Sequence, residues 1–231
     1  MILGIMQPYF CPYIGYWQLL NAVDKYVVYD NIQYSKKGWI NRNMILANNG
    51  TSHISIPIKK DSDYLDIRDR FVSGNLDKSK LLNQIRTIYK NAPHFKDAFE
   101  LMRRILLFED DNLFSYIYNS IKEICSYLSI NTELIVSSTI EIDHSLKGEK
   151  KVLSICKKLM ADTYYNAIGG IELYDKDLFK KEHIDLFFVK TQPVFYKQFS
   201  SDFRQNLSII DVLMFNSVEE VQLMLSKYEL L

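Results

Sequence analysis

Residues 6–16 read Met-Gln-Pro-Tyr-Phe-Cys-Pro-Tyr-Ile-Gly-Tyr, and this stretch constrains the fold more than any other part of the chain. Pro8 and Pro12 each fix φ near about −65° and lack a backbone N–H, so we expect a stiff loop here. A short apolar strand, residues 2–6, precedes the loop. A helix with a broad apolar face is predicted from Ile14 onward. A second strand, Lys25–Asp30, is aromatic and β-branched, which completes a βαβ unit.

Composition indicates an ordinary globular protein and excludes some classes. The 231 residues are 48% hydrophobic and 24% charged, which is enough to bury a sizeable core in a single domain spanning 1–231. Lys and Arg together number 28, as do Asp and Glu, so nothing indicates a nucleic-acid partner. No apolar run reaches the roughly 20 residues of a membrane span. No targeting peptide is expected, because residues 1–20 lack a basic start and contain two prolines.

The cysteines and histidines predict neither a disulfide framework nor a metal site. Cys11, Cys125 and Cys156 are scattered and form no Cys-x-x-Cys pair, which favours a reducing compartment. The four histidines do not cluster, and no zinc-ligand spacing is present. We therefore expect a cytoplasmic protein without a bound metal or a dedicated cofactor.

The remaining chain alternates between strands and helices, with one interruption. Asn48-Asn49-Gly50 is a hairpin signal between arms at 39–46 and 52–58. Three amphipathic segments, 78–91, 95–108 and 111–128, predict a helical insertion at about 78–129. Strands are then expected at 133–137, 163–166 and 184–189, and helices at 148–160, 173–181 and 206–225. This pattern predicts an α/β fold with a single Rossmann-like, mostly parallel sheet.

The candidate site lies where the predicted strands end. Loops that follow parallel strands converge on one edge of the sheet, and ligands bind there. We expect a cleft that is built from these loops and covered by the hairpin, with the Arg42 guanidinium contacting an anionic ligand. The predicted cleft residues are Gln7, Tyr9, Tyr13, Tyr16, Asp30, Gln33, Arg42, Asn43, Asn166 and Gly169.

Each of these candidates has a structural alternative. Tyr13 and Tyr16 could pack against Trp17, and Arg42 could form a structural salt bridge. Gly169-Gly170 is either a tight turn or a backbone nest for an anion. Ser208 and Asp211 could be helix caps. His94, which follows Pro93, is the histidine that we would test first, although a lone histidine is usually structural.

The first loop can be compared with the His-x-Gly-His motif of cytidylyltransferase-like nucleotidyl-transfer enzymes. Tyr13-Ile14-Gly15-Tyr16 has the same spacing, with tyrosine in both histidine positions. Backbone N–H groups at a helix N-terminus could still bind a phosphate, and Gly15 permits close approach. Cationic stabilisation of a transferring phosphoryl group would be lost. The βαβ unit is therefore nucleotidyltransferase/HUP-like in architecture, and nucleotidyl transfer is an alternative function.

A second resemblance covers nearly the whole chain. Residues 6–10 with 12–16, 38–43, 161–170 and 206–211 resemble, in order, the motifs of the WbqC-like protein family. Members of that family occur in gene clusters for bacterial O-antigen and related surface glycans and have been suggested to transfer glycine. Cys11 departs from the pattern of the family, which argues against Cys11 as a nucleophile.

This resemblance implies a transferase that places a glycyl or similar acyl group on the amine of a nucleotide-linked amino sugar. Such chemistry needs an activated acyl donor, a base and oxyanion donors. From their positions, Asp30 is the predicted base, and Asn41, Asn43 and the Gly169-Gly170 amides are the predicted oxyanion donors. A non-catalytic module that binds nucleotide sugars is a third hypothesis.

Overall fold

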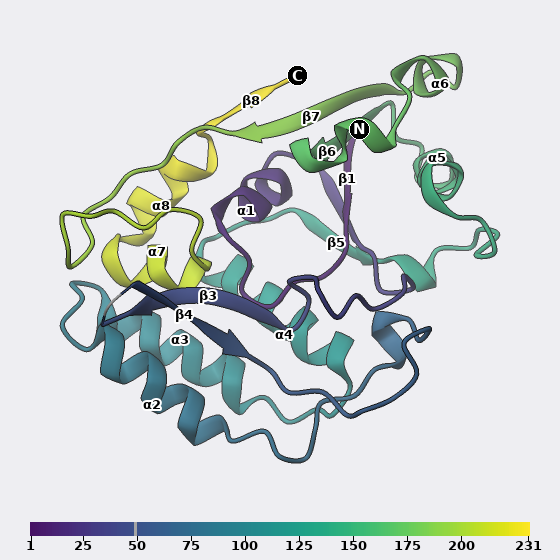
Figure 1. Cartoon of the computed structure of the whole chain (residues 1–231). Coiled ribbons are helices and arrows are strands. Elements are labelled where there is room, and N and C mark those ends of the chain that lie inside the picture. Colours follow the sequence, from purple (N-terminus) through teal and green to yellow (C-terminus); the bar gives the residue numbers. More distant parts are fainter. Residues whose placement is uncertain (49) are drawn as a thin grey trace.

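The computed structural model describes residues 1–48 and 50–231 and contains a six-stranded sheet of order β5-β2-β1-β6-β7-β8 (Figure 1). All neighbours from β5 to β7 pair in parallel, and β8 pairs antiparallel with β7. The predicted α/β fold with a mostly parallel, Rossmann-like sheet is thereby confirmed. The strands are β1 (Ile2–Met6), β2 (Lys25–Val28), β5 (Glu133–Val136), β6 (Thr163–Ala167), β7 (Asp185–Thr191) and β8 (Tyr228–Leu230).

The strand order places a topological switch point beside β1. The chain proceeds outward from β1 to β2 and β5, and then returns to the other side of β1 to form β6 and β7. The connections therefore diverge between β1 and β6, and a crevice opens at the carboxyl ends of strands at such a point. The loop after β1 lies at this edge of the sheet.

Helices cover both faces of the sheet (Figure 1). Helices α5 (Gly148–Lys158) and α6 (Lys176–Lys181) pack on the face where Leu3, Ile5 and Val27 point. The other face, which includes Val28, belongs to a larger core containing Trp17. Neighbouring residues such as Val27 and Val28 belong to different cores because successive side chains of a strand point to opposite faces. The helices on the larger core are α1 (Ile14–Asn21), α2 (Lys78–Tyr89), α3 (Phe95–Leu107), α4 (Leu113–Tyr127), α7 (Ile209–Phe215) and α8 (Val218–Leu225).

The predicted helical insertion, which α2, α3 and α4 form, lies between β2 and β5 and follows a hairpin. The hairpin strands are β3 (Arg42–Ala47) and β4 (Gly50–Ser55), and Gly50 has φ +112°, which a non-glycine residue rarely adopts. Asn49 of the predicted turn lies outside the described residues. In the larger core, the insertion packs together with α1, α7 and α8. The assignment of 1–231 as a single domain stays a prediction.

Several element boundaries differ from those expected. Strand β2 ends at Val28 rather than at Asp30, because Asp30 turns its carboxylate toward the serines after β5. Ser137 begins a 3-10 helix (Ser137–Thr139) instead of ending β5. A 3-10 helix at Ile168–Leu173 replaces the start of the helix predicted at 173–181. Strand β8 was not predicted, since three residues are too short to show a period.

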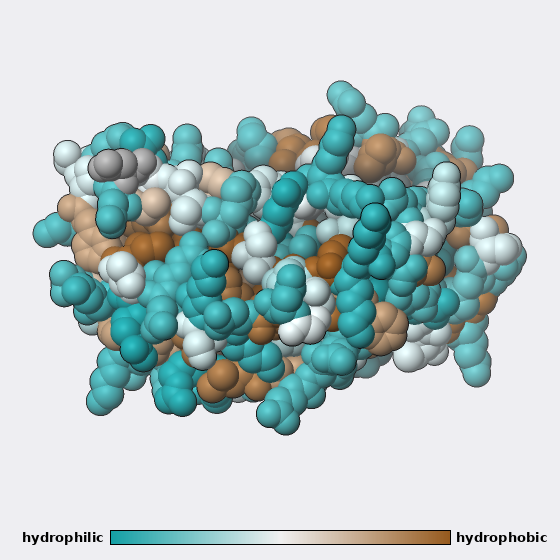
Figure 2. Space-filling view, turned by 60° about the horizontal axis from the view of Figure 1, so that its bottom comes forward, coloured by the Kyte–Doolittle hydropathy of each residue, from teal (hydrophilic) through white to brown (hydrophobic). Residues whose placement is uncertain are grey.

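Hydrophilic side chains cover most of the face shown in Figure 2, and hydrophobic ones form small, separated patches there. Within the described ranges, no helix has both the length and the apolar character that crossing a bilayer requires.

Gly15 lies in the first turn of α1, and a substitution at this position tests how tightly the first loop is packed. A Cβ at this position would lie 2.6 Å from the Tyr13 ring and would also overlap Thr191 Oγ1. We expect Gly15→Ala to lower the free energy of unfolding by about 1–3 kcal/mol, the usual cost of overpacking. Urea denaturation measures this change. Gly169→Ala is the control, because a Cβ at Gly169 meets no atom within 4 Å. Equal stability of the two variants would contradict the assigned packing.

Candidate functional site

The loop after β1 is fixed by residues from distant parts of the chain. The backbone N–H of Phe10 donates to Ile40 O at 2.8 Å, and the N–H of Ile209 donates to Pro12 O at 2.9 Å. The Cys11 carbonyl accepts two further bonds, from Asn43 Nδ2 at 3.0 Å and from Ser208 Oγ at 2.6 Å. The loop is therefore held by the hairpin and by the start of α7.

Cys11 itself is a structural residue. Its φ is +43°, in the left-handed region, and its side chain is fully buried. Burial raises the pKa of the Cys11 thiol, so the thiolate is strongly disfavoured. These features agree with the sequence argument against Cys11 as a nucleophile.

A cavity of about 350 Å³, which we call the aromatic pocket, opens beside this loop. Trp39 is 45% exposed, and Tyr9 and Tyr13 are half-buried, so aromatic faces remain accessible. Flat apolar walls with a few polar groups suit a planar or sugar ring. The pocket is lined by Tyr9, Pro12, Tyr13, Trp39, Asn43 and Asn206.

Arg42 lies next to Trp39, with its guanidinium carbon 5.9 Å from the ring centroid. Its Nε and one terminal nitrogen each donate to a backbone carbonyl at 3.1 Å, those of Gly38 and Lys37. Arg42 thus fixes the turn that carries Trp39, and the structural salt bridge considered for it is not formed within residues 1–48 and 50–231. A contact between Arg42 and an anionic ligand stays a prediction.

The amides predicted as oxyanion donors already have protein partners. Asn43 Nδ2 donates to both Phe10 O and Cys11 O, which uses both of its N–H groups. Asn41 accepts a bond from Tyr34 OH at 2.8 Å and donates to Ile56 O at 2.7 Å. Both asparagines are therefore engaged in holding the walls of the site.

Other predicted residues lie away from the pocket or below the surface. Tyr16 is 4% exposed and packs its ring against Tyr9 and Tyr26. It therefore belongs to the core, in agreement with the alternative that Tyr16 is a packing residue. Gln33 is exposed and donates to Asp63 O. His94 precedes α3 and donates its backbone N–H to Met214 O, which lies about 7.5 Å along α7 from Ile209 and its bond to the first loop.

Asn166 lies near the end of β6, and Gly169 and Gly170 lie in the 3-10 helix that follows it. Asn166 Oδ1 accepts the backbone N–H of Ala167 at 2.8 Å, and its Nδ2 occupies the space where a Cβ of Gly170 would lie. Gly170 is therefore required for this packing, whereas Gly169 is exposed in a 3-10 helix. Gln7 lies at the start of the first loop beside Tyr9, whose pKa is raised by burial.

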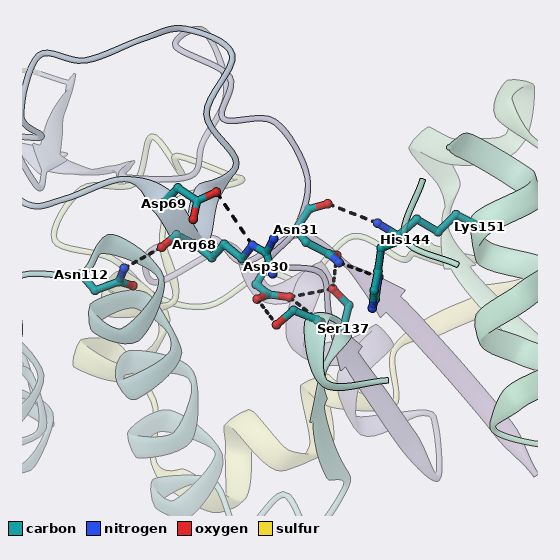
Figure 3. A network of polar contacts seen from close by, with 9 residues as sticks. Asp30, Asn31, Arg68, Asp69, Asn112, Ser137, His144 and Lys151 are labelled. Atoms are coloured by element: carbon teal, nitrogen blue, oxygen red, sulfur yellow. Dashed lines mark hydrogen bonds and ion pairs between the residues drawn. The ribbon is translucent and has the colours of Figure 1, made fainter. Parts of the chain in front are cut away.

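A second group of polar residues, the β2–β5 network, links the carboxyl ends of these two strands (Figure 3). Asp30 is 2% exposed, and its Oδ1 accepts bonds from Ser137 Oγ at 2.7 Å and from the Ser138 N–H at 2.9 Å. Its Oδ2 accepts a bond from Ser138 Oγ at 2.6 Å. Three donors thus occupy the carboxylate, and its role as a general base stays a prediction that these contacts do not favour.

The same network contains a buried lysine. Lys151 is 4% exposed, and its Nζ lies 3.4 Å from Asn31 O and 5.0 Å from the Tyr29 ring centroid. The Asn31 side chain in turn contacts His144 Nδ1 at 2.9 Å. Burial lowers the pKa of Lys151. Among the described residues, no group of three or more His, Cys, Asp or Glu side chains is placed to hold a metal ion.

Comparison with known proteins identifies the family. The model of the WbqC-like protein family matches residues 7–223. The chain belongs to this family. A protein described as "Uncharacterized protein Rv1507c", from Mycobacterium tuberculosis, is 28% identical over 213 residues, which are 91% of each chain. No solved structure matches the chain significantly.

In this WbqC-like protein, sequence reasoning missed the serines and the lysine of the β2–β5 network. Ser137 and Ser138 directly follow a strand, which was a usable signal for the sheet edge. Lys151 precedes Ile155 by four residues and so lies on the buried face of α5. A lysine on an apolar helix face was the signal for a buried cation.

Asp211 holds the segment 192–206, which follows β7 and borders the pocket at Asn206. The predicted cap of α7 is confirmed for Ser208, whose Oγ accepts the Ile210 N–H. Asp211, by contrast, is fully buried and accepts bonds from Tyr89 OH at 2.8 Å, Tyr196 OH at 2.6 Å and Gln198 Nε2 at 2.7 Å. Within the described ranges it forms no ion pair. Burial raises its pKa above the ordinary value of 3.8.

This raised pKa predicts a defined pH dependence of stability. A carboxyl group with a higher pKa in the folded state favours folding below pH 3.8, and the benefit is lost as the pH rises through the folded-state pKa. Asp211→Asn cannot titrate and places an amide NH2 group, itself a donor, among three donors, so it should be less stable than the parent. The deficit should be largest near pH 4 and should shrink toward pH 7.

Urea unfolding of both proteins across this pH range measures the effect, and Asp185→Asn, at an exposed position, is the control. A deficit that grows with pH would show that the folded state favours the Asp211 carboxylate.

Proposed function

We propose that this protein is a cytoplasmic transferase of bacterial surface-glycan biosynthesis. It places a glycyl or another aminoacyl group on the amine of a nucleotide-linked amino sugar. The resemblance to the WbqC-like family motivates the reaction class. The fold supports a small-molecule substrate, because the first loop lies at the carboxyl edge of a Rossmann-like sheet.

The aromatic pocket is the observation that carries the proposal. Its walls offer Tyr9 and Tyr13 from the loop after β1 and the half-exposed Trp39 from the turn before β3. Stacking of a nucleobase on an aromatic side chain contributes about 1–3 kcal/mol. The volume of about 350 Å³ lies within the range of small-molecule sites. We assign this pocket to a ring of the nucleotide-linked sugar.

The proposed reaction forms one bond and breaks one. The sugar amine attacks the carbonyl carbon of the activated acyl donor, an amide bond forms, and the bond to the leaving group breaks. The amine loses a proton to a base, and the leaving group takes up a proton. Asp30 and Asn43 are occupied by protein partners, so we propose that they position the walls of the crevice.

Trp39→Ala tests the ring-binding role of the pocket. We expect the variant to bind nucleotide-linked amino sugars more weakly by about 1–3 kcal/mol, because one stacking face is removed. Isothermal titration calorimetry measures the affinity. Tyr64→Ala is the matched control, since Tyr64 is 87% exposed and does not line the pocket. Equal affinities of the parent protein and Trp39→Ala would remove the pocket from the proposal.

Product analysis tests the reaction itself. The protein is incubated with a panel of nucleotide-linked amino sugars and glycyl or aminoacyl thioesters and esters, and the products are examined by mass spectrometry. We expect a mass increase of one acyl group on the sugar, which should fall in the Trp39→Ala variant. Binding without any acylated product would indicate a non-catalytic module, and pyrophosphate release from a nucleoside triphosphate would indicate nucleotidyl transfer.

A further inference from the structure

Lys151 is a buried cation, and the fold offers few contacts that offset the cost of burying its ammonium group. Its only hydrogen bond within the described part of the chain is the 3.4 Å contact with Asn31 O, so two of its three donors lack partners. It also lies in the first turn of α5 (Gly148–Lys158), where the helix dipole disfavours a positive charge. A buried charge of this kind costs several kcal/mol unless something pairs with it.

The carboxylates around Lys151 do not neutralise it at close range. The Asp30 carboxylate is occupied by the two serines after β5. Asp66 and Asp30 favour the charged form of Lys151 only through the longer-range field. Arg68 adds a second positive charge that further disfavours the charged lysine. His144 Nδ1 contacts the Asn31 side chain and not Lys151.

Arg68 is also incompletely paired. Its Nε lies 3.9 Å from Asp69, which is too long for a hydrogen bond, and its side chain is 45% exposed. The backbone fixes its place, because the Arg68 N–H donates to Asp30 O at 3.2 Å and Asn112 Nδ2 donates to Arg68 O at 2.6 Å. Figure 3 shows Lys151 and Arg68 reaching toward Asn31 from opposite sides.

We propose that Lys151 and Arg68 form a binding site for a phosphate-type anion, the diphosphate of the nucleotide-linked substrate. The two cations lie at the carboxyl edge of the sheet, where such folds bind phosphates. Arginine and lysine form charge-assisted hydrogen bonds with phosphate oxygens. Binding directs Nζ away from the Tyr29 ring and toward the anion. The site deepens the proposed function and rests on it only for the identity of the natural ligand.

Inorganic pyrophosphate tests the site without a sugar, a nucleoside or an acyl donor. Isothermal titration calorimetry is done with the parent protein and with Lys151→Met, Arg68→Gln and Lys150→Met. We expect the first two variants to bind pyrophosphate at least about tenfold more weakly and Lys150→Met to bind normally, because Lys150 is exposed on the same helix. Trp39→Ala should retain pyrophosphate binding, so failure of the ring pocket and failure of the anion site can be distinguished.

Thermal unfolding without pyrophosphate supplies a second readout. Methionine matches the length of lysine without its charge, so Lys151→Met should melt at the same temperature as the parent protein or above it. A clear fall would show that Lys151 supports the fold through Asn31 and would count against a ligand-binding role. If Lys151→Met does not fold, pyrophosphate binding by Arg68→Gln tests the proposal, since the Arg68 side chain is exposed. No pyrophosphate binding by the parent protein, or normal binding by Arg68→Gln, overturns the proposal.

Discussion

The carbonyl of Cys11 is the acceptor on which the arrangement of the site depends. Two buried donors, Asn43 Nδ2 and Ser208 Oγ, meet at this oxygen and join the first loop to the hairpin and to α7. Cys11 adopts a positive φ in this arrangement, which costs of order 1–2 kcal/mol for a residue with a Cβ. Two buried hydrogen bonds offset this cost, and leaving either donor without a partner would be more expensive still. This junction fixes the loop that precedes α1 and borders the aromatic pocket.

Among the described residues, the buried charged groups are Asp30, Asp211, Lys151 and Arg70, and they differ in how the fold satisfies them. Arg70 donates to the backbone carbonyls of Ser62 and Lys59. Asp30 and Asp211 each accept three hydrogen bonds from uncharged donors, so each carboxylate is solvated by the protein itself. Both join segments that are far apart in sequence, which is a structural use of charge. Lys151 is different, because its ammonium has a single long contact. The two buried carboxylates have full sets of protein donors, whereas the buried ammonium of Lys151 does not. This difference supports the proposal that Lys151 binds an anionic ligand.

The sequence was sufficient for the βαβ unit, the hairpin and the helical insertion, because each has a local signal in proline placement, alternation or helical period. It also indicated the carboxyl edge of the sheet as the place of the site, which stays a prediction. It could not show which polar groups face inward. Asn43 lies on a strand beside Arg42 and was expected to contact a ligand. Its Nδ2 instead donates to two backbone carbonyls, which only the folded loop brings within reach. Tyr16 was misplaced for the same reason, since its burial depends on Tyr9 and Tyr26. Strand β8 is defined by its pairing with β7, and tertiary pairing has no local signature.

The bond from Ser208 to Cys11 spans 197 residues, and this separation bears on how the protein is made. A ribosome adds about 5–20 residues per second, so roughly 10–40 s pass between synthesis of Cys11 and of its partner. During that time the apolar loop with Phe10 has been synthesised but lacks the α7 contacts that fix it. The first strand and helix can form early, whereas the pocket becomes complete only after nearly the whole chain has left the ribosome. The loop that borders the aromatic pocket is thus among the first parts of the chain to be translated and among the last to reach its final structure, and during that interval it is accessible to chaperones and proteases.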